Sequence, residues 1–169
     1  KGRPQFNPLI AHCADATEAI AAGIFNAEAR KLADAFWPGP LTLVVPASAT
    51  CPVTDLARAG LASVALRVPD HPLAQALLRA VGRPVCAPSA NRSGHVSATT
   101  ADHVMADLDG RIDAVIDGGP TAVGVESTIV SCLDGGPLLL RAGGVPRAAI
   151  ARVLGHPIAA PPRDGRDTA

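Results

Sequence analysis

Apolar residues fall along this chain in short blocks whose period changes from strand-like to helical and back. Residues 8–13 form an apolar run, and Asp15 stands where it caps a helix that begins near residue 16. After Asn26, apolar residues recur at helical spacing over 27–37, and the Pro-Gly-Pro sequence that follows must end the helix. The first part of the chain therefore predicts a strand followed by two helices.

The middle of the chain alternates between strands and a helix. Strands are predicted at 41–45 and 63–68, a helix at 71–81 and a short buried strand at 84–87. Within 63–68 the period-two alternation separates the side chains onto two faces. One face carries Val64, Leu66 and Val68, and the other carries Ser63, Ala65 and Arg67. We therefore expect Arg67 to project over small neighbours.

The last part of the chain predicts two more helices and a hairpin. The expected elements are a helix from a Thr99 or Thr100 cap to Leu108, a strand at 112–116, a hairpin of 129–130 with 138–140, and a helix opened by Pro146 and closed by Gly155. Strands interleaved with helices indicate helices packed against a sheet, and the hairpin makes that sheet mixed. The fold class predicted is therefore α+β.

Length and composition favour one globular domain. The chain has 169 residues, of which 48% are hydrophobic and 18% charged, far from the balance of disordered chains. We place the domain at 1–155 and interpret the proline-rich residues 156–169 as a linker or disordered tail. Fifteen basic and fifteen acidic residues cancel, so neither strong direct nucleic-acid binding nor membrane binding is expected.

The cysteines indicate the compartment. Cys13, Cys51, Cys86 and Cys132 are widely spaced, form no Cys-x-x-Cys pair and mostly have apolar neighbours. Buried free thiols are the favoured interpretation over a disulfide or a zinc site, because neither has the necessary spacing. No apolar run approaches the roughly 20 residues that span a bilayer. A soluble, cytoplasmic protein is expected.

Cationic residues are the first candidates for chemistry. Lys1 and Arg3 are two residues apart, and Pro4 favours an extended Arg3, so both could face one phosphate or carboxylate, or could form a solvated basic end. Arg67 ends its strand and could grip a carboxylate through two parallel hydrogen bonds, or could pair with Asp70 or with water.

Two polar loops and one strand end are further candidates. Residues 88–94 follow the short strand 84–87 and offer Ser89 and Asn91 to a phosphate or ribose, unless they form an ordinary polar turn. Residues 124–130 offer Ser127 in the same way, and Arg141 is a phosphate contact or a surface arginine. His12, in an apolar run, is a core histidine or part of a site. Neither a P-loop nor a GxGxxG sequence is present.

Six blocks of residues, in order, resemble the YrdC family across residues 1–155. They are Lys1-Gly2-Arg3-Pro4 with Asn7-Pro8-Leu9, Phe36-Trp37-Pro38-Gly39-Pro40-Leu41-Thr42-Leu43, Arg67-Val68-Pro69 with His71-Pro72, Pro88-Ser89-Ala90-Asn91-Arg92-Ser93-Gly94, Gly124-Val125-Glu126-Ser127-Thr128-Ile129, and Arg141-Ala142-Gly143-Gly144. The resemblance implies a three-layer fold with a twisted mixed sheet flanked by helices. It also implies an enzyme, a threonylcarbamoyl-AMP synthase. Such a nucleotidyltransferase forms threonylcarbamoyl-AMP and pyrophosphate from L-threonine, bicarbonate and ATP, for threonylcarbamoyladenosine in tRNA.

The resemblance also implies roles for particular residues. Lys1 and Arg3 would be catalytic, facing phosphate and carbamate, while Arg67 and His12 would bind threonine. The nucleotide would be bound by Lys1, Arg3, Ser89, Asn91, Ser127 and Arg141. Mg²⁺ is expected, held mainly by the ATP phosphates because the sequence offers no carboxylate pair, and no protein metal site is expected. A separate tRNA-modifying transferase would use the product.

The chain departs from the family pattern at its front. Family members carry a segment before the Lys-x-Arg-Pro motif, with a Thr-x-Tyr-Gly-Leu-type loop beside the threonine site, whereas this chain begins at the motif. The domain is therefore expected to be N-terminally incomplete. Two alternatives remain open. One is the related domain of carbamoyltransferases, which adenylates a carbamoyl group, and the other is an RNA-binding YrdC-like module.

Overall fold

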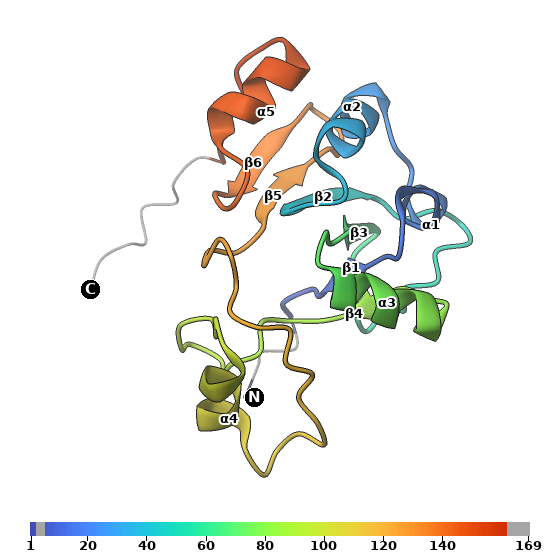
Figure 1. Ribbon diagram of the computed structural model, residues 1–169. Helices are drawn as coiled ribbons and strands as arrows, with labels where there is room; N and C mark the ends of the chain where they lie inside the picture. The colour runs from blue at the N-terminus through green and yellow to red at the C-terminus, as the bar shows by residue number, and fades with distance from the viewer. Residues whose placement is uncertain (3–5, 162–169) are drawn as a thin grey trace.

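The strands of this protein form one mixed sheet. The computed structural model describes residues 1–2 and 6–161, and Figure 1 shows the sheet running through the middle of that part of the chain. The elements, in chain order, are β1 (Ile10–His12), α1 (Ala16–Ala22), α2 (Ala27–Phe36), β2 (Leu41–Pro46), β3 (Ser63–Arg67), α3 (Pro72–Val81), β4 (Val85–Cys86), α4 (Ala101–Leu108), β5 (Thr128–Ser131), β6 (Leu138–Arg141) and α5 (Arg147–Leu154). The strand order is β4-β1-β3-β2-β5-β6.

Strand direction decides which ends of the strands meet. β1 and β3 are parallel, β2 is antiparallel to β3 and parallel to β5, and β6 is antiparallel to β5. β1, β3 and β6 therefore run in one direction, and their last residues lie at the edge where β2 and β5 begin. This edge gathers His12, Arg67 and Arg141 from three strands that are distant in the sequence.

One face of the sheet is covered by helices and forms the core. Side chains from α1, α2 and α5 pack onto it, and the buried set is led by Ala19, Leu32, Ile150, Leu41, Leu43, Leu66 and Val130. Along β3, Val64 and Leu66 are buried while Ser63, Ala65 and Arg67 are only partly so. The predicted division of this strand into two faces is confirmed, and Arg67 lies on the face away from the core.

Helix ends follow the capping chemistry that the sequence predicts. Asp15, Asn26 and Thr100 each accept a backbone N–H from the first turn of α1, α2 and α4, at 2.8, 2.8 and 3.3 Å. Gly155 ends α5 at φ 82°, a left-handed conformation that favours glycine. Pro146 precedes α5 as its N-cap residue instead of opening its first turn.

The strand predicted at 112–116 is wrong. Ile112 and Ile116 are exposed, and no neighbouring strand pairs with this segment within the described chain. An apolar alternation becomes a strand only when another backbone takes its N–H and C=O groups. The α+β class with a mixed sheet and helices packed on it is confirmed.

Packing continues past the predicted domain boundary at residue 155. Ile158 is buried, the N–H of Leu139 donates to Ala159 at 2.8 Å, and Leu138 and Ala159 form an isolated bridge. At least the first residues of the predicted linker thus contact the domain. Residues 162–169 lie outside the described part.

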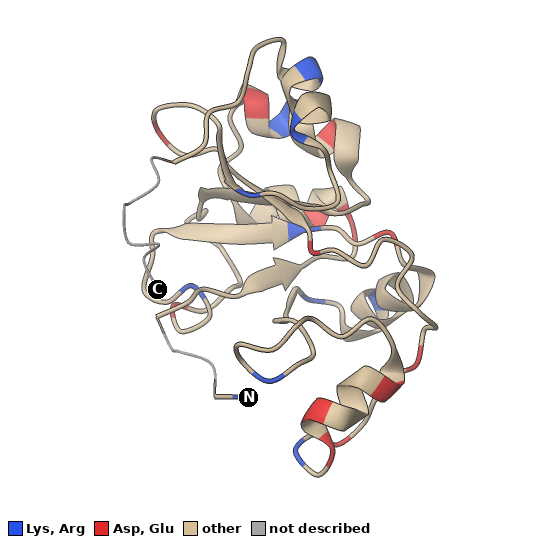
Figure 2. Cartoon of the chain, turned by 90° about the vertical axis from the view of Figure 1, so that its left-hand side faces the viewer, with Lys and Arg blue, Asp and Glu red and all other residues tan. Residues whose placement is uncertain are grey.

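Charged side chains avoid the strands. Figure 2 shows basic and acidic segments interspersed over helices and loops, while the strand arrows are largely uncharged. In the described strands only Arg67 and Arg141 are charged, and each is the last residue of its strand. No helix in the described ranges is long and apolar enough to cross a membrane. All four cysteines are free, as predicted, with Cys13 and Cys132 buried.

Candidate functional site

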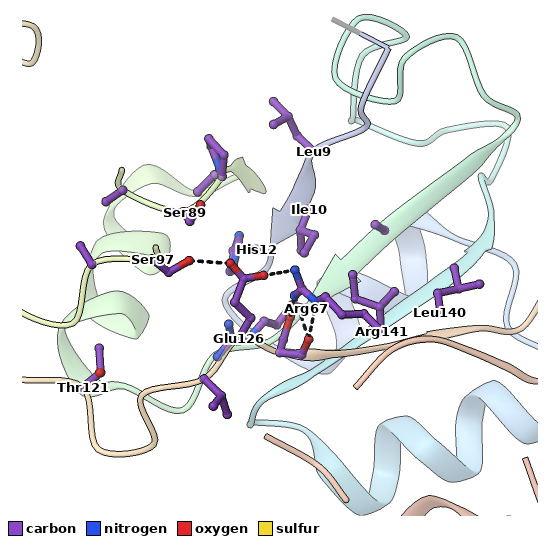
Figure 3. A pocket seen from close by; sticks show the side chains of 18 of the residues that line it. Leu9, Ile10, His12, Arg67, Ser89, Ser97, Thr121, Glu126, Leu140 and Arg141 are labelled. Carbon is purple, nitrogen blue, oxygen red and sulfur yellow. Dashed lines mark hydrogen bonds and ion pairs between the residues drawn. The ribbon is translucent and has the colours of Figure 1, made fainter. Parts of the chain in front are cut away.

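The face of the sheet that the helices of the core leave open is the floor of a cavity of about 800 Å³. Its lining comes from five strands, β1, β2, β3, β5 and β6, and from the segments around residues 87–99 and 121–127 (Figure 3). Among the described lining residues, the charged or titratable ones are His12, Arg67, Glu126 and Arg141. A polar cluster on an otherwise apolar, concave surface is the usual form of a small-molecule site.

Strand register aligns the polar side chains of the floor in one row. His12 pairs with Arg67, Thr42 with Ile129, and Ile129 with Arg141, so paired residues project on the same side. Arg67 and Arg141 are separated by two intervening strands, which places their backbones about 14 Å apart. The floor therefore presents two cations from different strands whose charges still interact, because the positive charge of Arg141 adds to the burial that lowers the pKa of Arg67.

Arg67 is anchored by the Pro-Gly-Pro turn. Its Nε donates to the carbonyl of Gly39 at 3.1 Å, and the N–H of Gly39 donates to Val68 at 2.8 Å. Trp37 and Leu41 flank this turn and hold it closed, because the buried indole N–H of Trp37 donates to the carbonyl of Leu41 at 2.8 Å. The Nε of Arg67 is thus occupied, whereas among the described residues neither Nη group has a hydrogen-bond partner, so both can meet a ligand. Among the described residues no ion pair joins Arg67 to Asp70, the alternative that the sequence left open.

His12 is held neutral beside that guanidinium. Burial lowers the pKa of His12 below its usual value, and the positive charge of Arg67 lowers it further. Its Nδ1 is buried without a geometrically adequate hydrogen-bond partner in the described structure. A neutral imidazole at the cavity wall can accept a hydrogen bond from an ammonium or hydroxyl group of a ligand.

Arg141 is oriented at the other end of the row by backbone and side-chain acceptors. Its Nε and Nη2 donate to the carbonyl of Ser127 at 3.0 and 2.8 Å, and Nη2 also donates to the Ser127 hydroxyl at 3.0 Å. That hydroxyl lies 2.8 Å from the Oγ1 of Thr42, a residue with no exposed surface. The remaining nitrogen, Nη1, is paired with Glu126.

Gly143 allows the segment that follows β6 to lie directly against the backbone of residues 126–128. A Cβ at residue 143 would lie 2.3 Å from the carbonyl oxygen of Glu126 and 2.5 Å from the nitrogen of Thr128. The N–H of Gly144 donates to Glu126 at 2.9 Å. Only glycine at residue 143 permits this approach of backbone to backbone.

The loop 88–94 forms the wall nearest the N-terminus. The Nζ of Lys1 donates to the carbonyls of Ser89 and Asn91, and the Lys1 carbonyl accepts from Ser93 at 2.9 Å. A second cavity of about 130 Å³ lies here and shares Ser89, Ser97 and Glu126 with the larger one. Lys1 therefore stands beside the main cavity, within the same group of lining segments.

The structure brings most predicted site residues to these two cavities. His12, Arg67, Ser89, Ser127 and Arg141 line the larger, and Lys1 and Asn91 line the smaller. The amide nitrogen of Asn91 is used within its own loop, donating to Arg92 at 2.9 Å and His95 at 2.7 Å. Arg3 lies outside the described residues.

Sequence reasoning gave no role to Thr42, Ser97 or the Glu126 carboxylate. Thr42 was not recognised because it lies within an apolar strand. A hydroxyl in such a run is nevertheless a signal of a buried polar contact. Glu126 was noticeable as the one acid within the six blocks.

Comparison with known proteins assigns the chain to a family. The model of the Sua5/YciO/YrdC family, described as "Telomere recombination", matches residues 1–143. Two threonylcarbamoyl-AMP synthases are similar over 92% of the chain: that of Bacillus subtilis is 51% identical, and that of Pyrococcus abyssi 48%. The matched regions are 45% and 46% of those relatives, so the chain spans about half their length.

Solved structures agree. The crystal structure of P. abyssi Sua5 complexed with L-threonine matches 100% of this chain and 50% of its own, with a TM-score of 0.91 at 44% identity. A family match over more than half of the sequence, close relatives and a shared architecture have one explanation. The chain belongs to the Sua5/YciO/YrdC family.

Proposed function

We propose that this protein is a threonylcarbamoyl-AMP synthase, which joins N-carboxylated L-threonine to the adenylate of ATP and releases pyrophosphate. The observation that carries the proposal is the placement of Arg67 and Arg141. They are the only charged residues of the described strands, and both line the same cavity. Two arginines occupy separate ends of one cavity, and each is pre-oriented by backbone carbonyls. The reaction brings together two anionic substrates, which must be bound apart and then joined.

Arg67 suits the amino-acid end of the substrate pair. Its free Nη groups form a fork for a carboxylate, and the neutral His12 beside it can accept a hydrogen bond from the threonine amine or hydroxyl. The relative that was crystallised with L-threonine has the same fold over this whole chain, which supports a threonine site here.

Arg141 suits the nucleotide end. It lies with Ser127 at the edge of the sheet, opposite Ser89 of the facing loop and near Lys1. A carbamate oxygen attacks the α-phosphorus of ATP, the bond from that phosphorus to the bridging oxygen breaks, and pyrophosphate leaves. Negative charge accumulates at phosphorus and on the leaving group, so oriented cations and N–H donors lower the barrier.

Mg²⁺ fits this site only as a companion of ATP. Within the described residues no group of three His, Cys, Asp or Glu side chains is placed to hold a metal, and the cavity has one carboxylate, which Arg141 already engages. The phosphates of ATP would supply most of its ligands, and the ion would neutralise the departing pyrophosphate. The chain's own part is to position the α-phosphate.

Bicarbonate as the carbon source and a downstream transferase as the consumer of the product belong to the same proposal. Threonylcarbamoyl-AMP is a mixed anhydride, a reactive acyl donor that another enzyme must pass to tRNA. The equal numbers of acidic and basic residues, fifteen of each, give the chain no broad positive charge for nucleic acid, which favours a small-molecule role.

The test is the substrate dependence of pyrophosphate release. We expect release from ATP only when L-threonine and bicarbonate are both present, with loss of activity when either is omitted. L-Serine, which lacks the methyl group, serves as the matched control for side-chain recognition. Equal release when carbamoyl phosphate replaces threonine and bicarbonate would instead assign the chain to the carbamoyl-adenylating enzymes.

A further inference from the structure

Glu126 is an unexpected residue in a cavity built for anions. It is the only carboxylate among the described lining residues, and its side chain reaches between the two walls (Figure 3). One oxygen, Oε1, accepts from the hydroxyl of Ser97 at 2.6 Å, and the other, Oε2, pairs with Nη1 of Arg141. The contact joins the loop after β4 to the end of β6, across the mouth of the proposed nucleotide site.

Counting the donors of Arg141 shows what the contact does. A guanidinium has five N–H groups. The one on Nε and the two on Nη2 serve Ser127, and one of the two on Nη1 serves Glu126. A single N–H, on Nη1, is left over, so a phosphate that approaches Nη1 must compete with Glu126 for that nitrogen.

The exposure of the pair fits a contact that breaks readily. The side chains of Arg141 and Glu126 are 36% and 40% exposed, so water screens their attraction. Exposed pairs of this kind stabilise a fold very little. The fold itself is held at this point by Gly143, Gly144 and the buried Thr128 hydroxyl, which donates to Val145 at 2.8 Å.

We propose that Glu126 is an internal stand-in for the substrate phosphate: it occupies Arg141 and Ser97 in the ligand-free protein and is displaced when the anionic group binds. Glu126 is thus a positioning residue that acts through Arg141. It keeps the guanidinium and the Ser97 hydroxyl oriented toward the space that the ligand fills, and it lowers the apparent affinity for the ligand by competing for the same donors. The identity of the ligand as ATP rests on the proposed function.

A substitution that removes the charge of Glu126 but keeps its shape tests whether the carboxylate competes with the ligand for Arg141. Glu126→Gln can still accept from Ser97 but no longer competes electrostatically for Arg141. We expect Glu126→Gln to bind ATP and inorganic pyrophosphate about three- to tenfold more tightly than the unmodified protein, as loss of a half-screened charge near the ligand implies. Asp134→Asn removes the same charge from the exposed turn of the β5–β6 hairpin and should change neither affinity.

A double-mutant cycle locates the effect. The gain from Glu126→Gln should disappear in an Arg141→Met background, because the competitor then has nothing to compete for. A purely structural role for Glu126 would not produce this coupling with ligand affinity. A gain of the same size with and without Arg141 would show a general field effect and overturn the proposal, and so would unchanged or weaker binding by Glu126→Gln.

Isothermal titration with the two probes distinguishes this proposal from the enzymatic one. If pyrophosphate binds more tightly to Glu126→Gln but ATP does not bind to either protein, the displaced carboxylate is supported and the proposed function fails. If ATP binds equally to both proteins, the proposed function survives and the displaced carboxylate is wrong. If pyrophosphate binds to neither protein, Arg141 is no anion site and this inference is overturned.

Discussion

Arg67→Lys is the substitution that tests the division of the cavity most directly. The change keeps the positive charge and does not alter the packing of the core, since Arg67 lies on the face of β3 that lines the cavity. It removes the planar fork and also the Nε contact to Gly39, which fixes the guanidinium at 3.1 Å. A flexible ammonium in its place loses both the geometry and the anchor.

The expected loss follows from hydrogen bonds to a charged group. Replacing a bidentate, charge-assisted grip by a single point charge removes one such bond, which costs about 1.5–3 kcal/mol in a partly desolvated site. This corresponds to a loss of about ten- to a hundredfold in affinity for threonine. ATP affinity should hardly change, because the substitution keeps the positive charge of residue 67, which interacts with Arg141, and leaves Arg141 itself intact.

Calorimetric titration of threonine and of ATP, each alone, measures both affinities. Arg79→Lys is the matched control, because Arg79 is exposed on α3 and donates only to Gln75 at 2.9 Å in the described structure. That variant should bind both ligands normally. If Arg67→Lys weakens threonine and ATP equally, or neither, Arg67 is a structural residue and the assignment of the carboxylate to it is refuted.

Two further predictions concern packing and thiol chemistry. Gly143→Ala should lower the free energy of unfolding by about 2–3 kcal/mol, because its Cβ overlaps the backbone of Glu126 and Thr128, and the melting temperature should fall by about 4–12 °C; an unchanged melting curve would contradict the close approach. Burial raises the pKa of Cys13 and Cys132 to about 12, so both stay protonated at pH 8 and should resist iodoacetamide in the folded protein while all four cysteines react after unfolding. Peptide mass spectrometry reads each position, and rapid labelling of either buried thiol in the folded state would be inconsistent with this structure.

The parts of the fold that the sequence predicts are those with local causes. The Asp15 and Thr100 caps, the closure of α5 by Gly155 and the alternation along β3 each depend on a few neighbouring residues, and each is present. The strand order places β1 beside β3 and β2 beside β5, pairings that depend on contacts between segments far apart in the sequence. The segment 112–116 shows the limit most clearly, because its pattern is that of a strand but no strand among the described residues pairs with it.

The residues of the site also divide into those that the sequence predicts and those that depend on long-range contacts. Arg67 and Arg141 were recognisable because each ends a strand, and Ser89 and Ser127 because they lie in polar loops directly beside strands, where ligands commonly bind. The Gly39 anchor of Arg67 and the contact of Thr42 with Ser127 were not, because each joins residues 28 and 85 positions apart. Motif spacing identifies candidate ligand-contacting residues more readily than it identifies the residues that orient their side chains.

The two arginines differ in a way that follows from their surroundings and bears on the order of events. Arg67 has its Nη groups open toward the cavity, and burial lowers its pKa from the usual value, so a carboxylate that reaches it regains an interaction that water provides poorly there. Arg141 is already satisfied by Ser127 and Glu126, and an anion that reaches it must first displace a carboxylate. On the proposed function, the Arg67 end of the cavity can therefore bind the amino-acid carboxylate directly, whereas a phosphate at Arg141 must compete with Glu126. Because ATP greatly exceeds threonine in negative charge, a site without that restraint would attract nucleotide strongly wherever a cation was free. On the proposal made above, the charge of Glu126 would reduce this imbalance between the two proposed substrates at the end of the sheet where the nucleotide is proposed to bind.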